Sequence, residues 1–315
     1  MTIHRSSSRR DAVSQRTGVY PREVTLRLSA PVQLAPETWH QLADEHAERA
    51  DALTEAHRRR ASRAEKHPVE DFLFTYYSYK PAILRRWHPG PGVVLNGGAD
   101  QRGGWRWYEI VGGRNVRVAD EQFRQERASL YRGVTGLLRA TRDRAGVFGC
   151  FGLHEWAMVY RTDATRHEIP LRLGAAGTDA VVEAHDLRCT HFDAFRFFTP
   201  EAVPLNREPL DREGAVAREQ PGCLHAGMDV YKWMLKLGPL VPGHLLLDAF
   251  VLARDIRELD MRASPYDLRD WGYSPVAIET AEGKAEYVRQ QRLLSARGQA
   301  LRAAVLDVVD AAAAV

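Results

Sequence analysis

The spacing of apolar positions predicts a mostly helical chain. Between residues 36 and 66, Trp39, Leu42, His46 and Ala50 recur at three- and four-residue steps, as on one face of a helix. The same periodicity predicts further helices, over residues 119–142, 153–161, 224–237 and 244–259 and from about residue 281 to the C-terminus. We expect Thr280 to cap the last of these and Gly298 to be its weak point.

Two shorter runs predict strands. GVVLNGG (92–98) and WRWYEIVGG (105–113) are rich in β-branched or aromatic residues and bounded by glycines, which indicates a β-hairpin. Residues 67–90 predict an aromatic helix that stops at His88-Pro89-Gly90, and residues 171–200 fit either strands or one buried helix. The predicted fold is therefore α+β and predominantly α-helical, with a helical core and a small β-hairpin or short sheet.

The organisation predicted along the chain has three parts. Residues 1–30 are polar and Arg/Ser-rich and are expected to be a disordered or loosely docked basic arm. Residues 31–66 form the N-terminal helix, and residues 67–315 form a single globular catalytic domain. No apolar run reaches the roughly 20 residues of a membrane span, and the N-terminus lacks the apolar core of a signal peptide. We therefore expect a cytoplasmic protein without membrane partners.

Charge and cysteine content bear on two classes of protein, nucleic-acid-binding proteins and disulfide-stabilised proteins. The 315 residues carry a formal net charge of +3, all of it in residues 1–66, so the remainder is neutral and gives nucleic-acid binding no support from net charge. The three cysteines are an odd number, which argues against a disulfide framework and favours small packed thiols.

Three short segments each combine a cysteine, a histidine and a carboxylate. They are Cys150…His154-Glu155, Cys189…His191…Asp193 and Cys223…His225…Asp229. His225 and Asp229 are four residues apart, so on one helix they share a face. Three histidines with carboxylates are enough for a non-heme iron or zinc site, with His154, His191 and His225 as candidate ligands.

The same segments also fit metal-free cleavage of a glycosidic bond. That reaction needs a carboxylate to stabilise an oxocarbenium-like cation or to activate water, and aromatic rings to stack on the base. Asp193 or Asp229 would be the carboxylate, Glu155 is a further candidate, and Tyr76, Tyr77 and Trp156 would stack. Arg196 is either the partner of Asp193 or a substrate contact. Arg262 and Tyr266 either belong to a salt-bridge network over residues 255–270 or bind an anionic group.

Long stretches of the chain resemble a known group of proteins. GCFGLHEWAMVYR, HFDAFRFF, QPGCLHAGMDVYKW and ARDIRELDMRASPYDLRDWGY are similar to actinobacterial proteins identified as 3-methyladenine DNA glycosylases, over residues 67 to about 300. The resemblance implies a hydrolase of base–sugar N-glycosidic bonds that needs no cofactor and acts on damaged DNA or on a small nucleoside or nucleotide. It also implies that the turn Leu237–Gly243 is a degenerate phosphate-binding hairpin, with Asp248, Asp255 or Asp260 downstream.

Two further classes of function remain open at this stage. One is a metal-dependent enzyme acting on a small molecule through the histidine and carboxylate residues, with iron or zinc as the cofactor. The other is a non-catalytic binding or scaffold protein in which the same residues form a polar core network.

Overall fold

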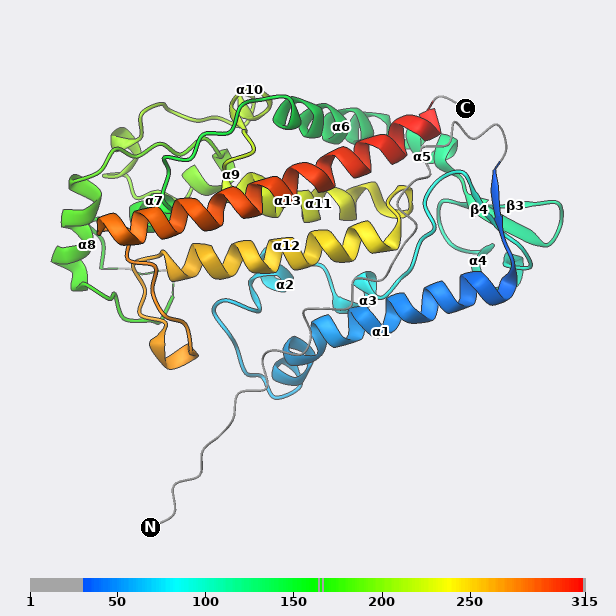
Figure 1. The fold of residues 1–315 in the computed structure, drawn as a ribbon, viewed down its shortest axis with the longest axis horizontal. Helices are drawn as coiled ribbons and strands as arrows, with labels where there is room; N and C mark the ends of the chain where they lie inside the picture. Colours follow the sequence, from blue (N-terminus) through cyan, green and yellow to red (C-terminus); the bar gives the residue numbers. More distant parts are fainter. Residues whose placement is uncertain (1–30, 164, 166, 314–315) are drawn as a thin grey trace, which may run out of the picture. The chain divides into compact units, whose positions relative to one another are not determined.

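Three long helices form the centre of the structure, a computed structural model that describes residues 31–163, 165 and 167–313. They are α11 (Leu224–Leu237), α12 (Gly243–Arg262) and α13 (Ala281–Ala313), which pack side by side (Figure 1). A Cβ on Gly227 would lie 2.8 Å from Cδ1 of Ile256, so this glycine lets α11 and α12 approach closely. Helix α6 (Ala128–Arg142) packs against α11 and α13. The predicted helical core is confirmed.

A small mixed sheet completes the α+β fold. Its strands are β1 (Val32–Leu34), β2 (Val93–Leu95), β3 (Tyr108–Val111) and β4 (Asn115–Val118), in the order β1-β2-β4-β3 with β1 parallel to β2. The predicted hairpin partner is wrong: β3 pairs with the following strand β4, through the turn at Gly112-Gly113, and β2 pairs with β1 and β4. Two consecutive glycines at positive φ form a tight turn that selects the nearest strand.

The N-terminal helix α1 spans Pro36–Ala61, shorter than the predicted 31–66. Residues Val32–Leu34 form a strand because they add to the edge of β2, a long-range contact that helical periodicity does not report. Helix α1 packs on α12 through its buried face, and Nε1 of Trp39 donates to the Asn96 carbonyl at 3.0 Å. Residues Val32–Val315 form one compact unit, so α1 packs with the rest of the chain.

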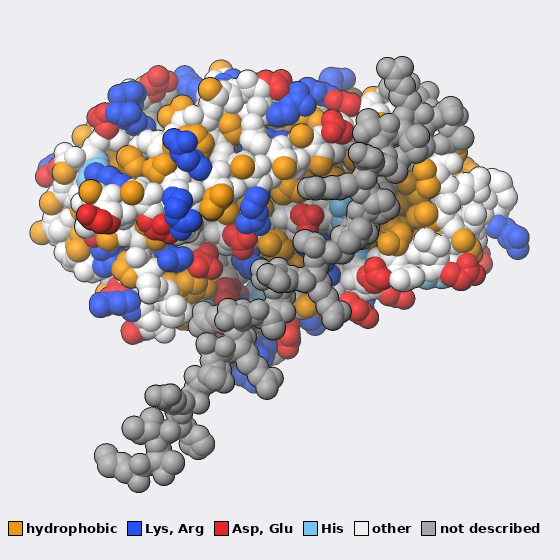
Figure 2. Space-filling model, viewed as in Figure 1, with side chains coloured by type: hydrophobic (Ala, Val, Ile, Leu, Met, Phe, Trp, Pro, Cys, Tyr) orange, Lys and Arg blue, Asp and Glu red, His pale blue; other side chains and the backbone are white. Residues whose placement is uncertain are grey.

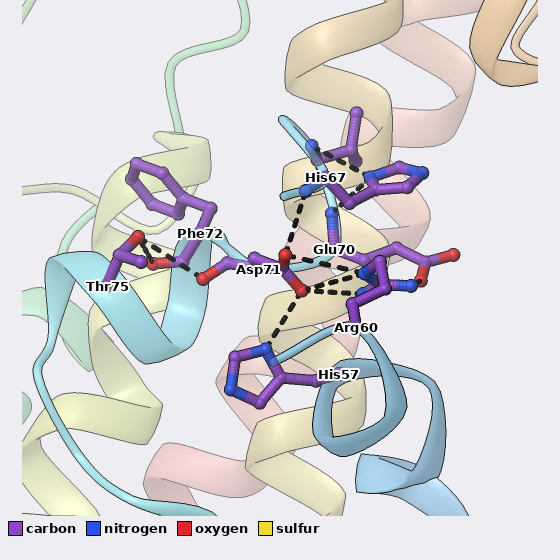
Figure 3. A network of polar contacts seen from close by, with 8 residues as sticks. His57, Arg60, His67, Glu70, Asp71, Phe72 and Thr75 are labelled. Carbon is purple, nitrogen blue, oxygen red and sulfur yellow. Dashed lines mark hydrogen bonds and ion pairs between the residues drawn. The ribbon is translucent and has the colours of Figure 1, made fainter. Parts of the chain in front are cut away.

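Asp71 joins the end of α1 to helix α2 (Phe72–Tyr76) (Figure 3). Its carboxylate accepts from the Arg60 guanidinium at 2.6 Å and from the backbone N–H of His67 at 2.8 Å, and lies 2.9 Å from Nδ1 of His57. Burial raises the pKa of Asp71, but Arg60 and His57 outweigh burial and leave that pKa lowered. A charged carboxylate therefore fixes the start of α2.

Short helices fill the regions between these elements. The expected aromatic helix over 67–90 is two pieces, α2 and α3 (Pro81–Leu84), because Ser78 at φ +59° and Pro81 interrupt it. The expected helix over 119–142 breaks at Arg127. Residues 171–200, for which strand and helix both remained open, contain helices. The remaining bounds are α4 (Ala99–Arg102), α5 (Asp120–Glu126), α7 (Leu153–Ala157), α8 (Gly174–Glu183), α9 (Phe192–Phe195) and α10 (Ala215–Arg218), with 3₁₀ turns at Val203–Leu205, Gly238–Leu240 and Arg269–Trp271.

The closing helix α13 begins as predicted. The Thr280 hydroxyl accepts from the backbone N–H of Gly283 at 3.0 Å, which is the geometry of an N-cap. The helix continues through Gly298, the expected weak point, without a break. Gly298 is buried, and a Cβ there would lie 3.7 Å from Cδ2 of Leu252 and 3.9 Å from Cα of Gly227, which are ordinary contact distances where α13 packs on α12 and α11.

The surface charge agrees with the balanced number of basic and acidic residues in residues 67–315. Figure 2 shows Lys and Arg interspersed with Asp and Glu over the face drawn. Within the described ranges, no helix combines the length and the apolar character needed to cross a bilayer. The predicted arm of residues 1–30 lies outside the described residues.

Candidate functional site

The three cysteine–histidine–carboxylate segments converge in the interior. His225, in the first turn of α11, lies between the other two histidines. Its ring centroid is 4.3 Å from that of His154 in α7 and 5.5 Å from that of His191, which precedes α9. The segments therefore share one region, which we call the histidine cluster, although about 70 residues separate the first and last along the chain.

The inner half of the histidine cluster is a buried charge network. Nε2 of His154 lies 2.7 Å from Oδ1 of Asp260 on α12, and Nδ1 of His154 lies 3.7 Å from the Cys150 sulfur. Nη1 of Arg257, one turn before Asp260, donates to Glu155 at 2.9 Å and to Asp260 at 3.1 Å. Two carboxylates, one guanidinium and one imidazole therefore neutralise each other away from solvent.

Burial and neighbouring charges set the protonation of this inner half. Burial lowers the pKa of His154, but Asp260 outweighs it and holds that pKa well above 6.5. Burial raises the pKa of Asp260, and His154 reverses the shift and leaves it strongly lowered. Burial, followed by the charge of His154, holds the pKa of His225 well below 6.5. The pKa shifts therefore favour a charged His154–Asp260 pair and a neutral His225 at pH 7.

The outer half of the histidine cluster centres on Asp229. The Tyr77 hydroxyl donates to its Oδ1 at 2.7 Å, and Nε2 of His191 lies 3.5 Å from its Oδ2. The Lys232 ammonium donates a short hydrogen bond to Oδ2 of Asp229 and a second bond of 3.3 Å to Oδ2 of Asp193. Lys232 therefore connects the two carboxylates proposed from the sequence.

Asp193 differs from Asp229 in its access to solvent. The Asp193 side chain is 28% exposed and the Asp229 side chain 4%. Burial raises the pKa of Asp193, but Lys232 and then His191 outweigh it, so the pKa is lowered and the carboxylate is ionised at neutral pH. Nε of Arg196 lies 3.4 Å from Oδ1 of Asp193. Asp193 is thus both charged and reachable.

Two sets of side chains in the histidine cluster have the spacing of metal ligands. His154, Glu155, His225 and Asp260 offer ligand atoms within 4.8 Å of one another, and so do His191, Asp193 and Asp229. The carboxylates of both sets are already paired with a cation, which is Arg257 in the first set and Lys232 in the second. A metal ion would have to displace these cations from their carboxylates or share the carboxylates with them.

Several residues expected to contact substrate make contacts within the fold instead. Trp156 is fully buried and its Nε1 donates to the Ala263 carbonyl at 2.9 Å, so it cannot stack on a substrate base and that prediction is wrong. Arg262 donates to the Ser274 carbonyl and to Glu258, in keeping with the expected salt-bridge network. Tyr266 packs in a small hydrophobic cluster with Val69. Tyr76 is half-buried and stacks on Phe72 at 5.0 Å.

The turn between α11 and α12 does not present a phosphate-binding hairpin. Pro239, Leu240 and Val241 are buried, and the backbone N–H groups of Val241 and Gly243 donate to the carbonyls of Gly238 and His88. These two N–H groups are thus used within the fold, and the two prolines of the turn have no N–H to offer. Of the three downstream aspartates, only Asp260 lies in the histidine cluster; Asp248 and Asp255 form exposed ion pairs with Arg49 and Arg297.

Three members of the histidine cluster were not expected from the sequence. Lys232 follows Asp229 by three residues on α11, a spacing that predicts an ion pair. Arg257 precedes Asp260 by three residues, a spacing that again predicts an ion pair, but its contact with Glu155 had no local signal, because the two residues are 102 positions apart. Glu219 also had none: it lies in a loop, with Oε1 3.3 Å from Nδ1 of His191.

The cysteines are free thiols, as expected from their odd number. Cys189 is buried, and burial raises its pKa well above 9.0. Burial also raises the pKa of Cys223. Both thiols therefore stay protonated and unreactive at neutral pH.

Protein-family models, curated proteins and solved structures were each searched, and none matches this chain.

Proposed function

We propose that this chain is a hydrolase that cleaves a base–sugar N-glycosidic bond, with Asp193 as its working carboxylate. The observation that supports this most is that Asp193 is ionised and partly exposed, while the other carboxylates of the histidine cluster are buried against cations or a tyrosine. A fixed negative charge next to the anomeric carbon stabilises the cation that develops as the bond to the base breaks.

The surroundings of Asp193 suit this chemistry. Lys232 and Arg196 hold the carboxylate from one side each, so that it keeps its position and its charge. Water adds its oxygen to the anomeric carbon, Asp193 accepts the water proton, and the base departs with the electron pair of the C–N bond and takes up a proton. Tyr76, half-buried near Asp193 and Arg196, offers a ring against which the base can lie.

Lys232 is expected to position Asp193 and to take no covalent part. Burial lowers its pKa, but Asp229 and Asp193 reverse the shift and leave the pKa raised, so the amine is protonated and is no nucleophile. We therefore propose hydrolysis by water. Treatment of the reaction with borohydride is expected to trap no enzyme–sugar adduct.

The test is release of free base by the purified full-length chain. Candidate substrates are alkylated DNA, nucleosides and nucleotides, and the expected result is release that falls at least about 100-fold in Asp193→Asn. Asp186→Asn, which changes an exposed carboxylate paired with Arg188, is the matched control and should keep full activity. Turnover that survives Asp193→Asn, or no base release from any of these substrates, would refute the proposal.

A second candidate is a metal-dependent enzyme acting on a small molecule. It is favoured by the closely spaced donor atoms of His154, Glu155, His225 and Asp260, a set that suits zinc or non-heme iron. Those four residues would hold the ion, which would supply Lewis-acid or redox chemistry. Elemental analysis of protein purified without chelator distinguishes the candidates, because only this one expects stoichiometric Fe, Zn or Mn and loss of activity in chelator.

A further inference from the structure

A cavity of about 730 Å³ lies apart from the histidine cluster. It is lined by the segment that leads into β3, by the junction of α5 and α6, and by the end of α11 with the turn that follows. Its size is that of pockets that take small ligands.

The charge of this cavity is one-sided. Four cationic side chains line it, Arg86, Arg106, Arg127 and Lys236, and its lining contains no Asp or Glu. All four are exposed, and among the described residues none of them is within ion-pair distance of a carboxylate, whereas the partly buried Arg60, Arg172 and Lys232 each have one. Burial lowers the pKa of His88, also in the lining, to about 3, so it adds no charge. The four cations therefore lack an anionic partner that the cavity has room to hold.

Aromatic rings accompany these cations. The Arg106 guanidinium lies 4.5 Å from the ring centroid of Trp107, and Arg86 lies 5.9 Å from that of Trp105. Behind Trp105, the buried Arg102 guanidinium lies 4.5 Å from the same ring and donates to a backbone carbonyl at 2.7 Å. The Trp105 ring is thus held in place before any ligand arrives, which lowers the entropic cost of stacking on it.

The backbone at the cavity wall also has a feature typical of ligand-binding sites. Trp107 has φ +66°, in the left-handed region that a bulky residue rarely adopts. Its ring packs edge-on against Phe123 at 5.2 Å, at the wall of the cavity. A strained backbone that places an aromatic ring in a cavity is a feature of ligand-binding sites.

We infer that this cavity binds an organic phosphate that carries a planar ring, of the size of a nucleoside diphosphate. The arginine forks and Lys236 bind the phosphate oxygens, and the indoles of Trp105 and Trp107 stack on the ring. This inference rests on the cavity alone and holds whether or not Asp193 is catalytic.

The experiment is isothermal titration of the full-length chain with ADP, with pyrophosphate and with adenosine. We expect ADP to bind more tightly than either fragment, and its affinity to fall at least about threefold between 50 and 200 mM salt, because phosphate contacts are screened. No binding of ADP would overturn the inference. Pyrophosphate binding as tightly as ADP would overturn the assignment of the ring, and adenosine binding as tightly as ADP would overturn that of the phosphate.

Two variants locate the binding. Arg127→Gln should weaken ADP and pyrophosphate by about 10-fold, while Arg59→Gln, which removes an exposed unpaired arginine of α1, should leave both unchanged. Trp107→Leu should weaken ADP and leave pyrophosphate unchanged. Equal effects of Arg127→Gln and Arg59→Gln would overturn the placement. If Trp107→Leu does not fold, comparison of the three ligands on the unmodified chain still decides whether a ring is recognised.

Discussion

The imidazole Nε2 of His154 and Oδ1 of Asp260 lie 2.7 Å apart, and the Asp260 side chain has no exposure to solvent. Removing one partner of such a pair leaves the other charge buried and unpaired. We expect Asp260→Asn to lower the free energy of unfolding by about 3–5 kcal/mol. Asp255→Asn on the same helix, which breaks an exposed pair with Arg297, should cost less than about 1 kcal/mol. Equal losses in chemical denaturation would contradict this.

The same pair predicts the pH range in which it stabilises the fold. The folded-state pKa of His154 is raised above 6.5, so its contribution to stability is fully present below pH 6.5 and is lost as pH rises through the folded-state value. The folded-state pKa of Asp260 is lowered, so its contribution is present above pH 3.8 and is lost as pH falls. The difference in unfolding free energy between the unmodified chain and Asp260→Asn should therefore be largest between about pH 4 and 6.5 and smaller at pH 9. A difference that does not change with pH would refute the charged pair.

Asp71 should stabilise the joint between α1 and α2. Asp71→Asn weakens the contacts with Arg60 and His57, so we expect a loss of about 2 kcal/mol at pH 7 in the free energy of unfolding. Because the folded-state pKa of Asp71 is lowered, the difference should persist above pH 3.8 and vanish as pH falls through the folded-state value. Asp51→Asn is the control, since Asp51 pairs with the exposed Arg85 on the surface.

Much of this fold could be predicted from the sequence, because its centre consists of long periodic helices. Helices α11, α12 and α13 each bury a stripe that local spacing reveals, and Thr280 caps the last one through a contact three residues away. Strand pairing could not be predicted in the same way. The runs that contain β2 and β3 are both rich in β-branched or aromatic residues, which does not indicate their partners. β3 pairs with β4 through the turn at Gly112-Gly113, and β2 pairs with β4 and with the distant strand β1.

The histidines of the histidine cluster could be predicted from the sequence, but the long-range contacts of the cluster could not. Residue types and spacing identified His154, His191 and His225, which the structure brings together. Sequence reasoning wrongly made Trp156 a substrate contact, because an aromatic ring next to a carboxylate looks the same in a core and in a pocket. It could not find the contact between Arg257 and Glu155, which joins α12 to the distant helix α7.

Gly243 should not tolerate a side chain. A Cβ there would lie 2.8 Å from Nδ1 of His46 and from Cδ1 of Trp87, both fixed in the core. We expect Gly243→Ala to destabilise the fold by about 1–3 kcal/mol. Gly133→Ala, at an exposed position of α6 with open space around it, should instead stabilise by up to about 1 kcal/mol. Thermal unfolding of the two variants should show shifts of opposite sign.

The free thiols should differ in reactivity. Cys189 is buried with a raised pKa, while Cys150 is half-buried, so iodoacetamide at pH 8 should modify Cys150 first in the native protein. In denaturant all three cysteines should react at similar rates. Peptide mass spectrometry over time gives the order, and early modification of Cys189 in the native state would contradict the burial described.

Lys232 should control the pH dependence of the proposed reaction through Asp193. Removing its charge in Lys232→Met takes away the largest favourable interaction of the Asp193 carboxylate, so the pKa of Asp193 should rise. The acid limb of the profile of base release against pH should then move to higher pH, because a larger share of Asp193 is protonated at any given pH. Lys80→Met, which removes an exposed lysine, should leave the profile where it is. If Lys232→Met lowers the rate equally at every pH, Lys232 acts on stability or binding, and the assignment of Asp193 as the titrating carboxylate fails.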